Sequence, residues 1–540
     1  MTKPLRGFLL LVLGLTVGCN HDLGREPAPG PRCALTLELI DAETQQPVGG
    51  VIRLRRADAD AHHALVEIGE LGNRGFGIEP PGPIASWWVL PAKTTLSVPA
   101  ANLTLEAFAG LETELASRSL DLTGKRRAEL RVPLVHFYRA RALGHIAGNT
   151  HLHLKGQSKA QADRYLREVP AVDGLDVVFV SYLERAKADL EYTSNNYTRS
   201  DLEKMSHGHR HYGHGQEHRH NFGSHGEGYG HILLLDIPYI IHPVSIGPGI
   251  TAAGSDAPPL QQGIEQARSL GGKVVWAHNL FGFEDIPNWI TGRVHANNIF
   301  DGSHRGSYED TYYRYLNVGL RVPFSTGTDW FIYDFSRVYV QNARAMTPTE
   351  WLDRLAAGRT YITNGPLVEF SIDGKSTGDV IELDKPASVS ARGRAVSRVD
   401  FKQLELVHNG QIVHTVASRP EGGHFIAELD QTVAVDEPGW LAIRTPPPAP
   451  QDRPAPKLAV NVNEYGGPLF AHTSPVYVRI GGRDRFDQAT ATGLLAEMRS
   501  DKESILKQAR FADDSQRHQV LGVYDEAIEK LEQQIKASPH

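Results

Sequence analysis

The order of apolar and polar positions divides this chain of 540 residues into four parts. From Cys33 to about Phe137, short runs such as CALTLELIDA and VIRLRRA alternate apolar and polar residues between turn-like segments. Alternation at regular intervals is typical of strands that bury one face. We therefore expect a small antiparallel β-sandwich over residues 33–137.

The pattern changes between residues 138 and 365. Near-continuous apolar runs appear here (LDVVFVSYL, HILLLDIPYII and KVVWAHNL), with helix-like segments at 160–167 and 260–270. Buried parallel strands that alternate with helices predict an α/β core. Functional side chains in such folds collect at the carboxyl ends of the strands.

The remainder of the chain divides into a strand-rich part and a helical part. Residues 366–482 alternate again and predict a second β-sandwich, with an exposed Pro-rich loop at 445–456. Residues 483–540 favour helix, because Leu521, Tyr524, Ile528, Leu531 and Ile535 form one apolar stripe. The stripe fits either a helical hairpin packed on the body or a contact with a partner protein.

The first 19 residues have the order of an export signal. Basic residues precede an apolar run at 8–17, which is too short to span a bilayer permanently. The run ends just before Cys19 and resembles a bacterial lipoprotein signal, followed by a flexible tether at 20–32. We expect a protein that is lipid-anchored at Cys19 in the bacterial cell envelope, periplasmic or extracellular; ordinary secretion is the alternative.

Charge and cysteine content narrow the function. The chain has 56 basic and 63 acidic side chains and a net charge of −7, which gives no electrostatic reason to expect nucleic-acid binding. Besides Cys19 there is only Cys33, so a lipidated Cys19 would leave no disulfide within the chain. Histidine is the unusual residue, with 25 copies.

Two histidines, His151 and His153, stand at what reads as the end of a strand. Residues two apart in a strand point to the same side, so both imidazoles can bind one ion. Alone, such a pair is weak evidence for a metal site. His278 and Asp329 also follow apolar runs, and each read alone fits a core histidine or a turn residue.

A histidine-rich tract lies between residues 207 and 231, where eight of twenty-five residues are histidine. The tract is either a loose metal-scavenging loop or a segment with a few fixed ligands. We favour a mixture in which Glu217 and His231 are fixed and the other histidines are mostly mobile. A carboxylate such as Glu217 can bridge two metal ions.

Taken in order, GNTHLHL, GLDVVFVSYLER, GQEHRH with GYGHILLL, VVWAHNLFG and FSTGTDWF resemble the PHP (polymerase and histidinol phosphatase) metallohydrolases. The closest branch is the CehA/McbA-like metallohydrolases, and the resemblance covers roughly residues 140–480. It implies an α/β fold with a distorted (β/α)₇ barrel, flanked here by the two β-sandwiches and the helical tail. By motif, His151, His153 and Asp329 would hold a first metal, Glu217 would bridge, and His231 and His278 would complete a second.

Two departures from the family pattern concern a third metal. The family's Asp-His pair at the end of the second strand is replaced by Tyr182 and Leu183, and its late histidine by Phe331. We therefore expect a dinuclear site with two divalent ions, of zinc, manganese or iron. The alternative is a substitute ligand from the tract, such as His207 or His209.

The resemblance implies hydrolysis of a small-molecule substrate with an ester-like bond, such as a phosphoester, carboxylic ester or carbamate. Lys155 and Arg337 are the candidate catalytic residues, with Glu184 and Arg185 as further candidates near the substrate. Trp330 and Phe331 suggest an apolar or aromatic substrate portion. Two rival hypotheses are a degenerate PHP-like protein that binds metal or carbohydrate at the cell surface, and a metal-scavenging lipoprotein acting through residues 207–231.

Overall fold

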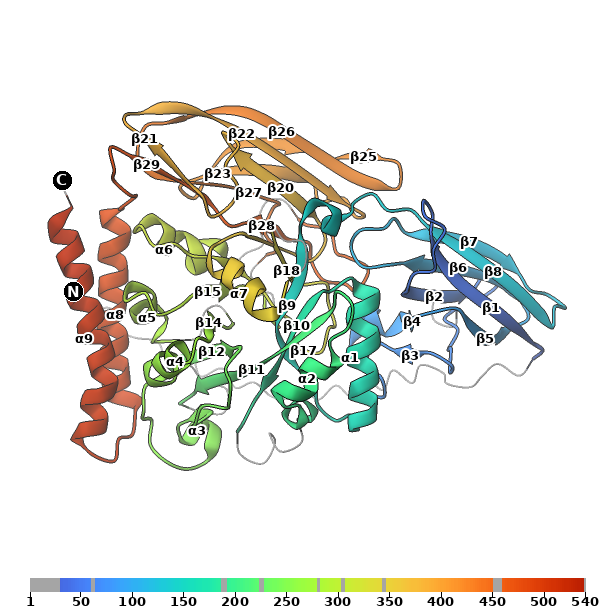
Figure 1. The fold of residues 1–540 in the computed structure, drawn as a ribbon, viewed down its shortest axis with the longest axis horizontal. Coiled ribbons are helices and arrows are strands. Elements are labelled where there is room, and N and C mark those ends of the chain that lie inside the picture. Colours follow the sequence, from blue (N-terminus) through green and yellow to red (C-terminus); the bar gives the residue numbers. More distant parts are fainter. Residues whose placement is uncertain are drawn as a thin grey trace, which may run out of the picture.

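The computed structural model describes residues 30–59, 64–185, 192–222, 228–278, 282–302, 306–341, 346–449 and 459–538. It is a mixed α/β protein with strands in several sheets (Figure 1). The proposed signal and Cys19, together with His225 and most of the Pro-rich loop, lie outside these residues. Within the described residues, no helix has both the length and the apolar character needed to cross a membrane.

The N-terminal strands form two sheets around a core of alternating apolar residues. One sheet has the order β5–β1–β8 and the other β3–β4–β2–β6–β7. The prediction of purely antiparallel pairing was wrong for one pair, because β1 runs parallel to β8. The strands are β1 (Arg32–Asp41), β2 (Gly50–Arg56), β3 (Gly72–Asn73), β4 (Trp88–Leu90), β5 (Thr94–Pro99), β6 (Asn102–Phe108), β7 (Ala116–Asp121) and β8 (Arg127–Leu134).

The central strands run mostly in one direction. Parallel pairs join β9 to β10, β10 to β11, β14 to β15 and β15 to β16, whereas β12 is antiparallel to both β11 and β14. The apolar run HILLLDIPYII was expected to form a parallel strand, and this was wrong because β12 is antiparallel to its neighbours. These strands are β9 (Ile146–His153), β10 (Val177–Tyr182), β11 (His211–His220), β12 (Gly230–Leu235), β13 (Ser245–Ile246), β14 (Lys273–Trp276), β15 (Ala296–Asn298) and β16 (Phe324–Ser325).

The chain then returns to the first central strand. β17 pairs with β9 in parallel, and β18 pairs with β9 in the antiparallel direction. These strands and the next are β17 (Asp329–Trp330), β18 (Arg337–Val340) and β19 (Thr360–Thr363). The helices of this part are α1 (Lys159–Asp173), α2 (Arg199–Met205), α3 (Pro248–Thr251), α4 (Leu260–Ser269), α5 (Asp285–Ile290), α6 (Arg314–Asn317) and α7 (Pro348–Ala356).

Helix α1 fixes the segment that follows β9. Ser158 caps its first turn by a reciprocal pair of hydrogen bonds with Gln161, and Gly174 ends it at φ 71°. At its C-terminal end, Asp173 forms a fully buried ion pair with Arg74 of the N-terminal part. The same guanidinium donates to the carbonyl of Ile332, so the N-terminal sheets and the central strands are held together at this point.

The C-terminal strands continue the central sheet. β28 pairs with β19, so one layer of this part is joined to the central strands, while β20, β22, β26 and β25 form a separate sheet. The strands are β20 (Leu367–Ile372), β21 (Val380–Leu383), β22 (Ala387–Ser397), β23 (Gln403–His408), β24 (Gln411–Ala417), β25 (Arg419–Glu421), β26 (His424–Val435), β27 (Gly439–Arg444), β28 (Ala471–Thr473) and β29 (Val476–Ile480).

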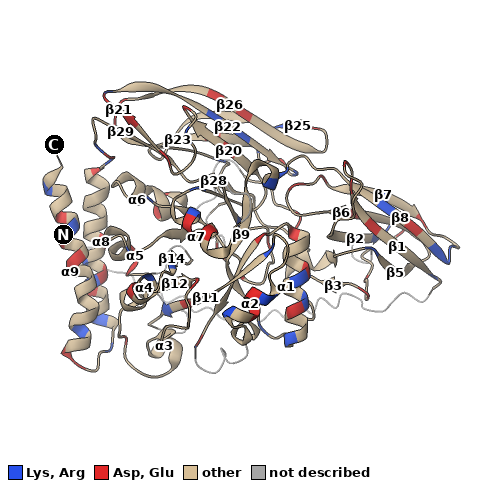
Figure 2. Cartoon of the chain, in the orientation of Figure 1, with Lys and Arg blue, Asp and Glu red and all other residues tan. Residues whose placement is uncertain are grey.

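A helical hairpin of α8 (Gln488–Gln508) and α9 (Asp514–Ala537) ends the described chain. Leu521, Tyr524 and Leu531 of the predicted stripe are buried in the core that also contains Trp289 of α5. Figure 2 shows acidic and basic residues on both helices, and Arg499 and Glu532 form an ion pair between them. The apolar stripe is therefore covered by the protein's own body.

Candidate metal centre

The structure brings together the six residues predicted as metal ligands, and it places each at one edge of the central strands. His151 and His153 end β9, Glu217 lies in the second half of β11, and His278 and Asp329 follow β14 and β16. His231 lies near the beginning of β12. Because β12 runs antiparallel to its neighbours β11 and β14, its beginning lies where those two strands end.

Four of these side chains form a first group around β9. Nε2 of His151 and Nε2 of His153 are 2.9 Å apart, and Oε2 of Glu217 lies 3.0 Å from the second nitrogen. Oδ1 of Asp329 lies 3.6 Å and 3.8 Å from the two nitrogens. One atom from each residue fits within the reach of a single metal ion.

Glu217 also belongs to a second group. Its other oxygen, Oε1, lies 2.9 Å from Nδ1 of His231 and 3.6 Å from Nε2 of His278. These three residues could again hold a metal ion. The carboxylate of Glu217 therefore turns one oxygen to each group.

Asp301 completes the cluster, and the sequence interpretation missed it. Its Oδ2 lies 2.8 Å from Nδ1 of His151 and 3.9 Å from Nδ1 of His278. Asp301 follows β15, whose three residues are too few to give a recognisable apolar run. Arg219 was also missed; its guanidinium lies 3.7 Å from Glu217 and comes from the same side of β11.

The hydrogen bonds on the far side of the rings fix which nitrogens face the cluster. Nδ1 of His153 donates to the carbonyl of Ser181 at 2.9 Å, because a carbonyl can only accept. By the same reasoning, Nδ1 of His278 donates to the backbone carbonyl of Asp301 at 3.1 Å. In a neutral ring the opposite nitrogen then carries no proton and has a free lone pair, as in metal-binding histidines.

His151 follows the same rule, since its Nδ1 donates to the Asp301 carboxylate. The neutral forms of His151 and His153 would thus turn two lone pairs towards each other at 2.9 Å. Oε1 of Glu217 and Oδ1 of Asp301 are buried and have no hydrogen-bond partner within the described chain. A cation beside the two histidine nitrogens would accept both lone pairs, and a cation beside Oε1 of Glu217 would give that oxygen a partner, so the residues fit bound metal.

The electrostatics of the cluster point the same way. Burial acts to lower the pKa of His278, but the carboxylates of Asp329, Glu217 and Asp301 outweigh it and raise the pKa to about 9. Burial likewise opposes charge on His151, and Asp301 and Asp329 raise its pKa well above the usual range. The carboxylates of Asp329, Glu217 and Asp301 therefore favour a positive charge within the buried cluster.

The backbone is strained where two of the ligands stand. His278 has φ 44° and Asp329 has φ 56°, both in the left-handed region that residues other than glycine rarely adopt. A Cβ on Gly327 would lie 2.6 Å from Cβ of His151, so only glycine permits the chain to pass this closely. The cluster is not fully shielded from solvent, because Asp329, His231 and His278 keep side-chain exposures of 14%, 19% and 21%.

The expectation of mostly mobile histidines in the tract is wrong for residues 211–220. They form strand β11, in which His214, His218 and His220 are buried. His218 bonds to the carbonyl of Val244, and His220 bonds to the carboxylate of Asp256 at 2.9 Å. His218 and His220 therefore have fixed partners within the protein.

The predicted catalytic residues lie in different places. Lys155 is exposed, and its ammonium lies 4.4 Å from the centre of the Trp330 ring, beside the cluster. Arg337 is buried and donates to the carbonyls of Phe335 and Asp173 at the end of α1. We therefore correct its assignment from a catalytic to a structural role.

The other candidates near the substrate are partly held by neighbours. Arg185 donates to the hydroxyl of Tyr192 at 2.9 Å. The Tyr182 hydroxyl lies 3.4 Å from the Glu184 carboxylate.

The apolar residues that stand where the PHP pattern has third-metal histidines are buried in the structure. Leu183 is fully buried, and its backbone is held by Asn195. Phe331 packs in the core, stacked on Tyr333 with ring centres 4.8 Å apart. The hypothesis that Phe331 lines a substrate pocket is therefore corrected, and only Trp330 lies beside the cluster.

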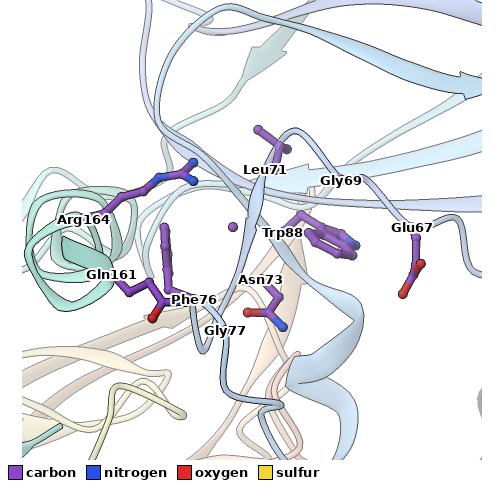
Figure 3. A pocket seen from close by; sticks show the side chains of 10 residues that line it. Glu67, Gly69, Leu71, Asn73, Phe76, Gly77, Trp88, Gln161 and Arg164 are labelled. Atoms are coloured by element: carbon purple, nitrogen blue, oxygen red, sulfur yellow. The ribbon is translucent and has the colours of Figure 1, made fainter. Parts of the chain in front are cut away.

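A separate cavity of about 400 Å³ lies between the N-terminal sheets and α1 (Figure 3). Phe76 and Trp88 line it from the N-terminal part, and Gln161 and Arg164 line it from α1. None of the candidate ligands contributes to it, so this cavity is not the metal centre.

Comparisons with protein-family models, with curated proteins and with solved structures find no match to this chain.

Proposed function

We propose that this protein is a metal-dependent hydrolase of ester-like bonds. The observation that carries the proposal is the convergence of histidine nitrogens and carboxylates whose outer hydrogen bonds turn bare lone pairs inward. A buried arrangement of this kind costs free energy unless a cation occupies it. Hydrolysis is proposed from the resemblance to the PHP metallohydrolases of the CehA/McbA-like branch.

We propose two divalent ions. His151, His153, Glu217 and Asp329 would hold the first, and Glu217, His231 and His278 would hold the second. Glu217 supports this division because its two oxygens face the two groups separately. The apolar residues Leu183 and Phe331 provide no ligand for a third ion.

The protein residues would supply position and charge. Ser181 and Asp301 orient the histidine rings from outside, which fixes the nitrogen that faces each ion. When bound, a pair of divalent ions would polarise the scissile group and lower the pKa of water at the site. A substrate would approach from the side of the partly exposed residues Asp329, His231 and His278.

We propose that the central strands form the distorted barrel of the PHP fold. The support is the order of pairings from β9 through β10, β11, β12, β14 and β15 to β16, and the return of the chain to β9 through β17. The ligands at one edge of these strands agree with the usual place of active sites in such folds. Domain limits near residues 137, 365 and 482 belong to the same proposal.

Attachment to the bacterial cell envelope through Cys19 is a further part of the proposal. It rests on the order of basic residues, apolar run and cysteine at the N-terminus. Metabolic labelling with an alkyne fatty acid tests it. Label on the wild-type chain that is absent from Cys19→Ser would support lipidation, and an unlabelled wild-type chain would contradict it.

The test of function begins with the metal content of the purified protein, followed by turnover. The wild-type chain, loaded with Zn²⁺ or Mn²⁺, is assayed on p-nitrophenyl phosphate, bis-p-nitrophenyl phosphate, p-nitrophenyl acetate and a p-nitrophenyl carbamate. We expect about two tightly held ions and turnover on one class, both lost in His153→Ala. His518→Ala, which changes an exposed histidine of α9 far from the tract in sequence, is the matched control.

The rival functions give different results in the same experiment. Tightly held ions without turnover would favour a degenerate surface protein that only binds metal or carbohydrate. Many weakly held ions, lost when exposed histidines of the tract are replaced, would favour metal scavenging. The fixed partners of His218 and His220 make scavenging the weaker candidate.

A further inference from the structure

A cation, Lys155, lies beside the candidate metal centre over the ring of Trp330, which packs against Tyr192. The Trp330 ring lies 5.0 Å from His153 and 5.0 Å from Tyr192, measured between ring centres. The ammonium of Lys155 lies 4.4 Å from the centre of the same Trp330 ring.

The backbone fixes all three residues relative to His153. Trp330 is the strand partner of His153 where β17 pairs with β9. Lys155 follows His153 by two residues and forms a backbone bridge with Tyr192. The backbone of Lys155 is therefore held just beyond the end of the strand that carries two candidate ligands.

A purely structural role explains this arrangement poorly. The neighbouring Phe331 is buried in the core, whereas Trp330 is only partly buried and Lys155 is exposed. An exposed cation–π pair contributes little to folding stability. Among the described residues, Lys155 has no ion-pair partner, while Lys159 on the following helix pairs with Asp163 at 2.7 Å.

The charge around the site adds to the case. Carboxylates dominate the cluster itself, and bound divalent ions would neutralise them. Lys155 then presents a positive head group with three hydrogen-bond donors at the edge of the cluster. The cation–π contact holds the ammonium without occupying its donors with a carboxylate.

We propose that Lys155 binds an oxyanion of the substrate, a carboxylate or phosphate close to the scissile bond, and that Trp330 acts as a positioning residue for Lys155. This inference rests on the proposed function, which supplies the idea that the protein has a substrate. It narrows the proposed substrates to anionic ester-like compounds.

The test uses binding, so that it does not depend on turnover. 4-Hydroxybenzoate and its uncharged amide, 4-hydroxybenzamide, are titrated calorimetrically into the metal-loaded full-length protein; phenyl phosphate replaces the benzoate in a second arm. We expect the wild type to bind one of the anions at least about tenfold more tightly than the amide. Lys155→Met should abolish this preference, and Lys155→Arg should keep part of it.

Two further variants separate the role of Lys155 from general effects. Lys159→Met removes another exposed lysine that lies over an aromatic ring, that of Tyr197 at 4.0 Å, and should leave the preference unchanged. Trp330→Leu should weaken the preference for anions while the metal content stays at the wild-type value. Metal content is measured for every variant, so misfolding is recognised.

Equal binding of anion and amide by the wild type would overturn the inference. An anion preference that persists in Lys155→Met would also overturn it, because the metal ions alone would then recognise the charge. An anion preference that depends on Lys155, found in a protein with no turnover on the ester panel, would refute the hydrolase and leave the anion site standing.

Discussion

Nδ1 of His151 lies 2.8 Å from Oδ2 of Asp301, and both side chains are fully buried. The carboxylate orients the ring so that Nε2 faces the cluster, and its charge makes that nitrogen a better ligand. Asn298 donates to the same oxygen at 2.9 Å and holds the carboxylate in place.

Replacing Asp301 by Asn should therefore lower metal affinity by about 10–100-fold. The amide keeps the size of the carboxylate but removes the charge that supports His151. Competition with a chromophoric chelator measures the affinity. Asp353→Asn, which changes an exposed partner of Lys273, is the control. Wild-type affinity in Asp301→Asn would refute the role of Asp301.

Metal stoichiometry tests the assignment of Glu217 as a shared ligand. His231 belongs to one group, so His231→Ala should reduce the content from two ions to about one. Glu217 belongs to two groups, so Glu217→Ala should disturb both ions. Native mass spectrometry counts the ions in each variant. Equal loss in the two variants would contradict two separable sites.

Asp256 should control how firmly the helical hairpin is attached. Its carboxylate accepts from His220 of β11 and from the backbone N–H of Arg510 between α8 and α9. In Asp256→Asn the side-chain NH2 would face one of these two N–H donors, which costs about 1–3 kcal/mol of unfolding free energy. Urea unfolding measures this loss, and hydrogen exchange should accelerate at residues 509–513. Asp525→Asn, on the exposed face of α9, should change neither.

Glu284 should make stability fall as pH rises. Burial raises the pKa of this carboxyl to about 7, although the N–H groups of Leu260 and Gln261 partly oppose the shift. The folded pKa lies above the unfolded value of about 4.5, so the folded state holds the extra proton between these values. The stability present below pH 4.5 is therefore lost as pH rises towards and through 7.

In Glu284→Gln this loss should disappear. The variant should gain stability relative to wild type between pH 5 and pH 8, by an amount on the order of 3 kcal/mol at most. Urea midpoints measured in a chelator exclude the separate pH dependence of metal binding. Glu526→Gln, an exposed carboxylate on α9, is the control. A constant difference across this pH range would contradict the raised pKa.

Much of the candidate cluster follows from local sequence pattern. An apolar run marks a buried strand, and a polar residue where the run stops lies at the edge of the sheet. This reasoning marked His151, His153, His278 and Asp329 as candidates without a structure, and the resemblance to the PHP metallohydrolases implied their roles as ligands. The mixed α/β class follows from the same pattern and is confirmed.

Other features depend on contacts between distant segments. Strand direction is one, because the apolar run at 231–235 does not encode whether β12 lies parallel or antiparallel to its neighbours. The buried strand β11 is another, since its histidines and glycines have no apolar pattern and are covered only after folding. The role of Arg337 likewise depended on the end of α1, 164 residues away in sequence.

The sequence by itself determined the residue types of the candidate ligands and, for those that follow an apolar run, the edge at which they stand, because hydrophobic periodicity and residue type act locally. Only the tertiary structure decided the partners: Asp301 behind His151, Trp330 beneath Lys155, and Glu217 between two groups. The reason is physical, since a hydrogen bond or ion pair depends on distances of a few ångströms between atoms that packing, and not chain order, brings together.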